Sequence, residues 1–228
     1  MADLHDSTEH YLATIFEIEE EGIEIKRARI AERLNISAPS VTEHIHRMEK
    51  LGLVRVSDNN SVSLTKTGKA QATTVVRRHR LAERLLVDVI GLDWENAHKE
   101  ADRWEHVISD DVEKKLIKLL NNPTTCPHGN PIPNSDGSQN AEAKETQKNT
   151  VALNDAEEAC PLTIRRIGER IEMNDEALHF VASNNLTPGA QISITGKTQE
   201  NVIVSLEGIA ELKIPRTISQ SMYVEATK

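Results

Sequence analysis

The chain has 228 residues, a net charge of −9, 38% hydrophobic residues and 3% aromatic residues, which suits one to three small domains with cores of Leu, Ile, Val and Ala. No run of 18 apolar residues occurs, so we expect no transmembrane helix, and the first ten residues lack the features of a signal peptide. The two cysteines are too few for a disulfide framework, which indicates a cytosolic (cytoplasmic) protein.

The charge is unevenly distributed along the chain. Residues 17–24 include five glutamates, whereas residues 26–55 include seven basic and three acidic residues, a net charge of +4. The acidic total argues against a general nucleic-acid binder. The compact basic segment nevertheless indicates one module that could contact nucleic acid.

The first 64 residues contain three helical patterns followed by two short apolar segments. Apolar residues recur at helical spacing in residues 4–21, 26–36 and 37–51. Ser37 or Ser40 is expected to cap the third helix and Gly52 to end it. The turn sequence SDNNS between the apolar segments predicts a β-hairpin. This order of elements indicates a winged helix-turn-helix; the alternative is a helical interaction module with a solvated basic face.

The rest of the chain combines helices, a linker and a β-rich end. Helices are predicted over residues 68–90, 93–108 and 109–120, the last two capped by Asp93 and Ser109. From Asn121 the chain is rich in Pro, Asn, Gly, Ser and Gln, which predicts a linker that is extended at first and disordered later. From Pro161, short alternating segments separated by glycines predict a small antiparallel barrel or sandwich.

Acidic residues and histidines share faces of the predicted helices. Asp102, Glu105 and His106 are spaced as i, i+3 and i+4, so a helix would bring them together. The same i, i+4 spacing occurs in the pairs His79–Glu83 and His98–Asp102. Helical bundles build metal sites from such pairs of histidine and carboxylate ligands. The alternative is two solvated, charged faces of amphipathic helices.

Four motifs within residues 1–133 carry a more specific pattern, namely STEHYLATIFEIEEEGIEIKRARIAERLNISAPSVTEHIHRMEKLGLV, RRHRLAERLL, DWENAHKEADRWEHVISDDVEKKL and GNPIP. This pattern resembles the diphtheria-toxin-repressor family of dimeric, metal-activated transcriptional repressors. The resemblance implies a mostly α-helical fold with a small β domain. It predicts a winged helix-turn-helix domain (1–73), a helical dimerisation and metal-binding domain (74–133), a flexible linker (134–159) and an SH3-like domain (160–228).

The resemblance also implies an activating metal site formed by His10, Asp102, Glu105 and His106. Iron-responsive members have methionine at the place of His10 and cysteine at the place of Asp102, so both sulfur ligands are absent from this sequence. Nitrogen and oxygen ligands suit manganese better than thiol and thioether sites do. The chain is therefore similar to the manganese-responsive branch, and Mn²⁺ is the expected signal; the alternative signal is Fe²⁺.

A second metal site is implied at His79, Glu83 and His98, so two ions per chain are expected. The SH3-like domain completes this site in the family, but the family's Glu and Gln are replaced by Asn174 and Ala177. Candidate substitutes are Glu172, Asp175 and Glu176. In the sequence CPHG, Cys126 and His128 match positions that some manganese-responsive members use in a second site. A linker turn with an incidental thiol is the alternative for this pair.

The expected function is a manganese-activated repressor of metal-uptake genes that binds double-stranded operator DNA as a homodimer. Metal would fix the separation of the two recognition helices. The expected DNA-contacting residues are Arg27, Ala28, Ser37, Pro39, Ser40, Thr42, Glu43 and Arg47. The expected dimer seam includes Leu81, Leu85, Leu86, Trp104, Val107 and Leu116.

Two other classes of protein are alternatives to a repressor. A metal-dependent hydrolase is disfavoured, since no set of residues for an activated nucleophile is found and all four ligands would hold the ion. We therefore expect no enzymatic activity. The second alternative is a zinc-stabilised scaffold that uses Cys126, His128 and Cys160.

Overall fold

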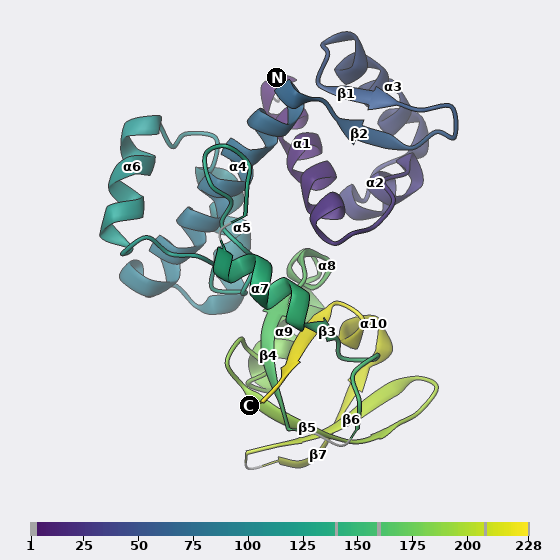
Figure 1. Ribbon diagram of the computed structural model, residues 1–228, viewed down its shortest axis with the longest axis vertical. Coiled ribbons are helices and arrows are strands. Elements are labelled where there is room, and N and C mark those ends of the chain that lie inside the picture. The colour runs from purple at the N-terminus through teal and green to yellow at the C-terminus, as the bar shows by residue number, and fades with distance from the viewer. Residues whose placement is uncertain (1–3, 140, 159–160, 208, 228) are drawn as a thin grey trace. The chain divides into compact units, whose positions relative to one another are not determined.

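The computed structural model describes residues 4–139, 141–158, 161–207 and 209–227 (Figure 1). The chain folds into two compact units, and each unit is discontinuous in sequence. The first unit contains the residues up to 79, together with 104–108 and 133–138. The second contains residues 80–103 and 109–132 and the chain from 139 onward. Cys160 lies outside the described residues.

The first unit contains the three predicted helices and the predicted hairpin. These are α1 (Leu4–Glu20), α2 (Arg27–Leu34), α3 (Ala38–Lys50), β1 (Val54–Val56) and β2 (Val62–Leu64). The two strands are antiparallel, with Val54 opposite Leu64. The helices enclose a core whose fully buried residues include Leu12, Ile15, Ile30, Ile45 and Met48. This arrangement confirms the winged helix-turn-helix fold.

Capping residues set the two ends of α3. Ser37 Oγ accepts a hydrogen bond from the backbone N–H of Ser40, so Ser37 is the N-cap. Gly52 follows the last helical turn with φ 71°, a left-handed conformation that favours glycine. The sequence therefore predicts both ends correctly, because each end depends on a local signal.

The helices that follow differ from the prediction in two places. After α4 (Lys66–Arg84), the predicted helix over 68–90 changes into a π-helical turn, η1 (Leu85–Ile90). The predicted helix over 93–108 begins as a 3₁₀ turn, η2 (Trp94–Asn96), without a side-chain cap from Asp93, and continues as α5 (Ala97–Trp104). Ser109 caps α6 (Asp110–Leu119) as predicted. Among the described residues, no helix is long and apolar enough to cross a membrane.

A six-stranded antiparallel sheet with the strand order β3-β8-β4-β5-β6-β7 belongs to the second unit. The strands are β3 (Val151–Ala152), β4 (Pro161–Ile167), β5 (Gln191–Lys197), β6 (Asn201–Leu206), β7 (Ile209–Pro215) and β8 (Met222–Ala226). Four of these strands, β4 to β7, correspond to the predicted alternating segments. The small β domain is therefore confirmed.

Three helices of this part were not predicted, namely α8 (Glu169–Glu172), α9 (Asp175–Ser183) and α10 (Arg216–Ser219). Helices of four residues, such as α8 and α10, are too short to produce a periodic apolar pattern. Asn174 caps α9 by accepting a hydrogen bond from the backbone N–H of Ala177. This cap marks the start of α9, so that Glu172 ends α8 and Asp175 begins the next helix.

Residues 134–159 contain regular structure where a flexible linker is predicted. Residues Ala141–Asn149 form α7, and β3 pairs with β8, so that Val151 lies opposite Val224. Leu153 and Ala156 are buried in the core of the sheet. The described residues of this stretch therefore include a helix and a strand that were not predicted, and the flexibility of the linker stays a prediction. Average composition does not reveal the pairing of β3 with β8 or the burial of Leu153 and Ala156.

Candidate metal centres and DNA-binding face

The first cluster of potential metal ligands joins α1 to the turn that follows α5. His10, Glu105 and His106 offer ligand atoms that all lie within 4.8 Å of one another. The rings of His10 and His106 meet edge to face, with centroids 5.1 Å apart. His106 Nδ1 lies 2.5 Å from Glu9 Oε2, and His106 Nε2 lies 3.3 Å from Glu105 Oε1. Two imidazoles and one buried carboxylate thus converge here, and no sulfur atom of a described residue belongs to this group.

His79 on α4 holds the carboxylate of Glu105. The Nδ1 atom of His79 lies 2.7 Å from Glu105 Oε2, and both side chains are buried. An imidazole in this position orients a ligating carboxylate, as partners behind metal ligands commonly do. The sequence assigns His79 to the second metal site, and that assignment stays a prediction.

Asp102, Glu105 and His106 do not share one helix, contrary to the spacing argument. Helix α5 ends at Trp104, whose carbonyl accepts a hydrogen bond from the backbone N–H of Val107 in a turn. Asp102 lies on α5 in the second unit and is half-buried. Helix periodicity overlooks this end because contacts distant in sequence, such as Glu105 with His79, direct the turn.

The second cluster lies within the second unit and is almost fully buried. His128 Nδ1 lies 3.1 Å from Glu83 Oε1 and 3.1 Å from Glu172 Oε2. His98 Nδ1 lies 3.4 Å from Glu83 Oε1 and 3.3 Å from Glu172 Oε2. The exposed fractions are 1% for Glu83, 2% for Glu172, 0% for His128 and 9% for His98. Two carboxylates and two imidazoles therefore face one another out of contact with bulk water.

Further donors surround this second cluster. Cys126 is 1% exposed, and its Sγ lies within 4.8 Å of ligand atoms of Glu83 and His128. Glu169 forms a comparable group with His98 and Glu172. Asn130 donates one hydrogen bond of 2.5 Å to Glu172 Oε1 and another of 3.0 Å to the Ile167 carbonyl. Asn130 thus holds one carboxylate oxygen of Glu172, Oε1, while the two histidines contact the other, Oε2.

Burial and neighbouring charges shift three pKa values in this cluster. Burial alone would lower the pKa of His128, but the carboxylates of Glu172 and Glu83 outweigh burial and raise this pKa. Burial, and then the charge of Glu169, raises the pKa of Glu172. Burial, and then the charge of Glu83, raises the pKa of Cys126 well above its ordinary value. A divalent cation would compete with protons for these groups.

The structure separates the candidates for the second site that sequence leaves open. Glu172 points into the cluster, but Asp175 is exposed and its Oδ2 pairs with Lys99 Nζ at 2.5 Å. The two residues lie on different helices, so proximity in sequence does not bring them together. Four contributors were missed, namely Glu9, Arg80, Asn130 and Glu169. Glu9 adjoins His10, and Asn130 lies within the motif GNPIP, so these two carried a signal in the sequence.

The predicted DNA-contacting residues lie mainly on an exposed face of the first unit. Six of them are exposed, namely Ala28, Ser37, Pro39, Ser40, Thr42 and Glu43. Arg27 and Arg47 are half-buried: Arg27 NH1 bonds Asn60 Oδ1 at 3.4 Å, and Arg47 NH2 lies 2.8 Å from His44 Nε2. His44 in turn stacks on Tyr11 of α1 at 4.0 Å. Contacts of α3 with α1 thus position a basic side chain beside the exposed face.

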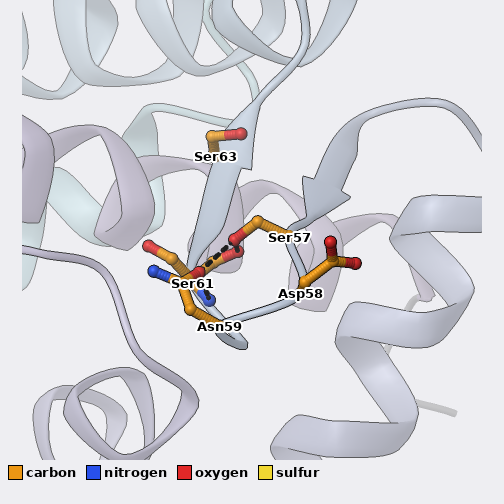
Figure 2. Close-up of a pocket in the computed structure, with 5 residues that line it drawn as sticks. All are labelled: Ser57, Asp58, Asn59, Ser61 and Ser63. Carbon is orange, nitrogen blue, oxygen red and sulfur yellow. Dashed lines mark hydrogen bonds between the residues drawn. The ribbon is translucent and has the colours of Figure 1, made fainter.

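The tip of the hairpin forms a polar hollow of about 550 Å³ (Figure 2). It is lined by Ser57, Asp58, Asn59, Ser61 and Ser63. Ser57 Oγ donates a hydrogen bond to the Ser61 carbonyl at 3.0 Å, which closes the turn. The sequence predicts this segment only as a turn. The structure adds that its hydroxyl and amide groups line a hollow in the same unit as the recognition helix α3.

Comparison with known proteins identifies two family domains in the chain. Residues 3–62 match "Iron dependent repressor, N-terminal DNA binding domain", and residues 65–134 match "Iron dependent repressor, metal binding and dimerisation domain". The first match coincides with the winged helix-turn-helix fold. The second includes His79, Glu83, His98, His106 and His128, and therefore most of both clusters.

Individual relatives extend the likeness over the whole chain. The iron-dependent repressor IdeR of Mycobacterium leprae is 43% identical over 228 residues, covering 99% of each chain. The diphtheria toxin repressor of Corynebacterium diphtheriae is 43% identical over 201 residues, covering 86% of this chain and 88% of that protein. A solved structure described as a manganese-dependent transcriptional repressor in complex with manganese superposes with a TM-score of 0.83 at 26% identity, covering 96% of this chain and 100% of the other.

These relatives are transcriptional repressors and not enzymes, and they match both the DNA-binding and the metal-binding regions of this chain. The chain therefore belongs to the iron-dependent repressor family, that of the diphtheria toxin repressor, and is a metal-dependent transcriptional repressor.

Proposed function

We propose that this repressor is activated by manganese, that it binds operator DNA as a homodimer in the cytoplasm, and that it controls genes for metal uptake. The observation that carries the choice of metal is the first cluster, in which His10, Glu105 and His106 converge without a sulfur ligand. Nitrogen and oxygen donors suit manganese, whereas soft thiolate and thioether ligands select other ions. Asp102 is proposed as a further oxygen ligand, on the family resemblance.

The donor sets of both clusters fit a divalent cation. Glu83 and Glu172 are buried side by side around His98 and His128, and buried carboxylates are costly unless a cation compensates them. In the first cluster, Glu105 is buried and already oriented by His79. We propose one ion for each cluster, two per chain. When bound, the ion supplies positive charge that joins ligands from separate segments.

The residues of the first unit explain how such a site would affect DNA binding. His10 belongs to α1, whereas Glu105 and His106 belong to the turn after α5. Helices α1 and α3 share one apolar core through residues such as Ile15 and Ile45. Fixing α1 to the turn therefore restricts α3 as well. In a dimer this fixes the distance between two recognition helices, which must match the spacing of the half-sites.

The proposed dimer contacts use apolar side chains that remain exposed in the single chain. Of the residues predicted at the seam, Val107 is 79% exposed, whereas Leu81, Leu86 and Leu116 are buried inside the chain. The buried leucines therefore stabilise the chain itself and are removed from the proposed seam. Other exposed apolar side chains in the matching region are Val89, Ile90, Val112 and Leu119.

Iron(II) is a second candidate for the activating metal. Curated relatives that are 41–43% identical over 99% of the chain are named iron-dependent repressors. Imidazole and carboxylate ligands also bind iron(II), which lies next to manganese in the order of affinities. The sulfur-free first cluster favours manganese and the relatives favour iron, so the two candidates need a direct comparison.

The deciding experiment is binding of operator DNA by the metal-stripped, full-length protein at fixed ionic strength. Manganese is titrated in one series and ferrous iron, under anaerobic conditions, in another. We expect half-maximal DNA binding at a free manganese concentration within the cellular range, and a weaker response to iron at its own cellular concentration. An equal or stronger response to iron would replace manganese by iron in this proposal, and DNA binding without any metal would contradict both candidates.

A further inference from the structure

A buried arginine lines a small cavity in the second unit. Arg166 on β4 is 9% exposed, and its guanidinium stacks on the ring of Tyr223 with its central carbon 3.9 Å from the ring centroid. The cavity has a volume of about 20 Å³ and is lined by Thr125, Gly129, Pro131, Thr146, Gln147, Thr150 and Arg166. It lies apart from the ligand atoms of both clusters, since none of their donors lines it.

Arg166 differs from the other arginines around it in having no anionic partner among the described residues. Its neighbour Arg165 is exposed and pairs with Glu225 at 2.8 Å, and the buried Arg80 pairs with Glu169 at 3.0 Å. No hydrogen bond or ion pair of the Arg166 guanidinium with a described side chain is present; its contact is the ring of Tyr223. A ring face stabilises the charge in part but accepts none of the five N–H donors.

The walls of the cavity are built by elements that hold each other closely. Residues 125–131 form a tight turn in which Thr125 pairs with Pro131 and the N–H of Gly129 bonds the Cys126 carbonyl. Gly129 has φ 88°, and a Cβ there would lie 2.1 Å from the Arg165 carbonyl oxygen, so only glycine lets the turn approach β4. On the other side, Thr146 of the α7 region adds a hydroxyl group, whereas the hydroxyl of Thr150 donates to the Gln147 carbonyl at 3.2 Å.

We propose that this cavity binds one small monovalent anion of the size of chloride, held by the Arg166 guanidinium and the hydroxyls of Thr125 and Thr146. No Arg166 nitrogen is among the described side-chain atoms that are enclosed without a partner, so the charge keeps some contact with water; an anion would neutralise this largely buried charge where a water molecule would not. A volume of about 20 Å³ has room for a single particle of this size, since one water needs roughly 10–15 Å³. The anion connects the turn, α7 and β4, whichever metal the clusters hold.

The test uses thermal unfolding of the full-length protein at constant ionic strength, with chloride replacing gluconate, which is too large for the cavity. We expect the melting temperature to rise by about 2–4 °C at saturating chloride, a shift typical for a ligand of the native state in a protein of this size. Arg166→Met should abolish the rise. The matched control is Arg165→Met, which removes the same charge from the next residue on the strand and should keep the rise.

A direct measurement accompanies the melting curves. Crystals grown or soaked in sodium bromide should show anomalous scattering from bromide in the cavity beside Arg166. A folded Arg166→Met protein that keeps the chloride effect, or a cavity that holds only water in bromide, would overturn the proposal. If Arg166→Met fails to fold, Thr146→Val and the bromide crystal test the proposal instead. Thr146→Val should reduce the rise in melting temperature that chloride causes. An unchanged rise would count against the site.

Discussion

The two clusters of potential metal ligands differ in how far they are exposed to solvent. In the first, only Glu105 is buried, whereas His10 and His106 are half-buried. In the second, the exposed fractions of Glu83, Glu172 and His128 are 2% or less. A ligand set open to solvent can exchange an ion quickly and so report its concentration, whereas a buried set couples the ion to the stability of the fold. We therefore propose that the first cluster senses the metal and that the second stabilises the fold.

The largest expected effect concerns the first cluster. Glu105→Ala removes the buried carboxylate between His79 and His106, and we expect metal-dependent DNA affinity to fall by more than the roughly 10–100-fold typical for loss of a supporting partner. The measurement is operator binding at saturating manganese. The matched control, Glu100→Ala, removes a half-buried glutamate of α5 that pairs with Arg103, and should bind like the parent. Parental binding by Glu105→Ala would remove sensing from this cluster.

A smaller effect on DNA binding, but a clear effect on stability, is expected in the second cluster. His128→Ala removes the fully buried imidazole between Glu83 and Glu172, and should lower the metal content by one ion per chain and the stability of the loaded protein by about 3–5 kcal/mol. DNA affinity at saturating metal should change less than tenfold. The control is His179→Ala, whose exposed ring pairs with Glu95. Unchanged metal content would contradict a second ion.

The smallest expected effect is a difference in pH dependence between the metal-free and the loaded protein. Because the folded-state pKa values of His128 and Glu172 are raised, their contribution to the free energy of unfolding is complete below the unfolded-state values and is lost as pH rises through the folded ones. The metal-free protein should therefore begin to lose stability as pH rises above about 4.5, the ordinary value for Glu172, and lose more above about 6.5, the ordinary value for His128.

The loaded protein should show the opposite trend, since metal must displace these protons and binds more tightly as pH rises. Calorimetry of metal binding in two buffers of different ionisation enthalpy should record proton release, which His128→Ala should reduce. The same pH trend in both states of the protein would show that His128 does not exchange its proton for metal.

Local signals in the sequence predict the first unit well. Ser37 and Gly52 mark the ends of α3, and the turn sequence SDNNS marks the hairpin, so each boundary depends on a few neighbouring residues. The two clusters could be predicted only in part. Glu105 and His106 were singled out for a helix spacing that does not exist, because α5 ends at Trp104.

Sequence reasoning missed Glu169 and named Glu172 only as one of three candidates, because both residues owe their positions to contacts distant in the chain. Glu169 and Glu172 lie on a four-residue helix, and their burial depends on packing against Arg80, His98 and Asn130. No pattern within residues 161–175 distinguishes the buried Glu172 from the exposed Asp175. Strand β3 was missed for a similar reason, since it is stabilised by pairing with β8 near the end of the chain.

Gly129 has a consequence for how this protein tolerates mutation. Its hydrogen atom faces the main chain of β4, and a methyl group in its place would meet the Arg165 carbonyl oxygen at 2.1 Å. Any other residue must push residues 125–131 away from the strand, which displaces His128 from Glu83 and Glu172. A screen of single substitutions should therefore rank Gly129 among the least replaceable positions of the chain, although it has no side chain that could bind a metal.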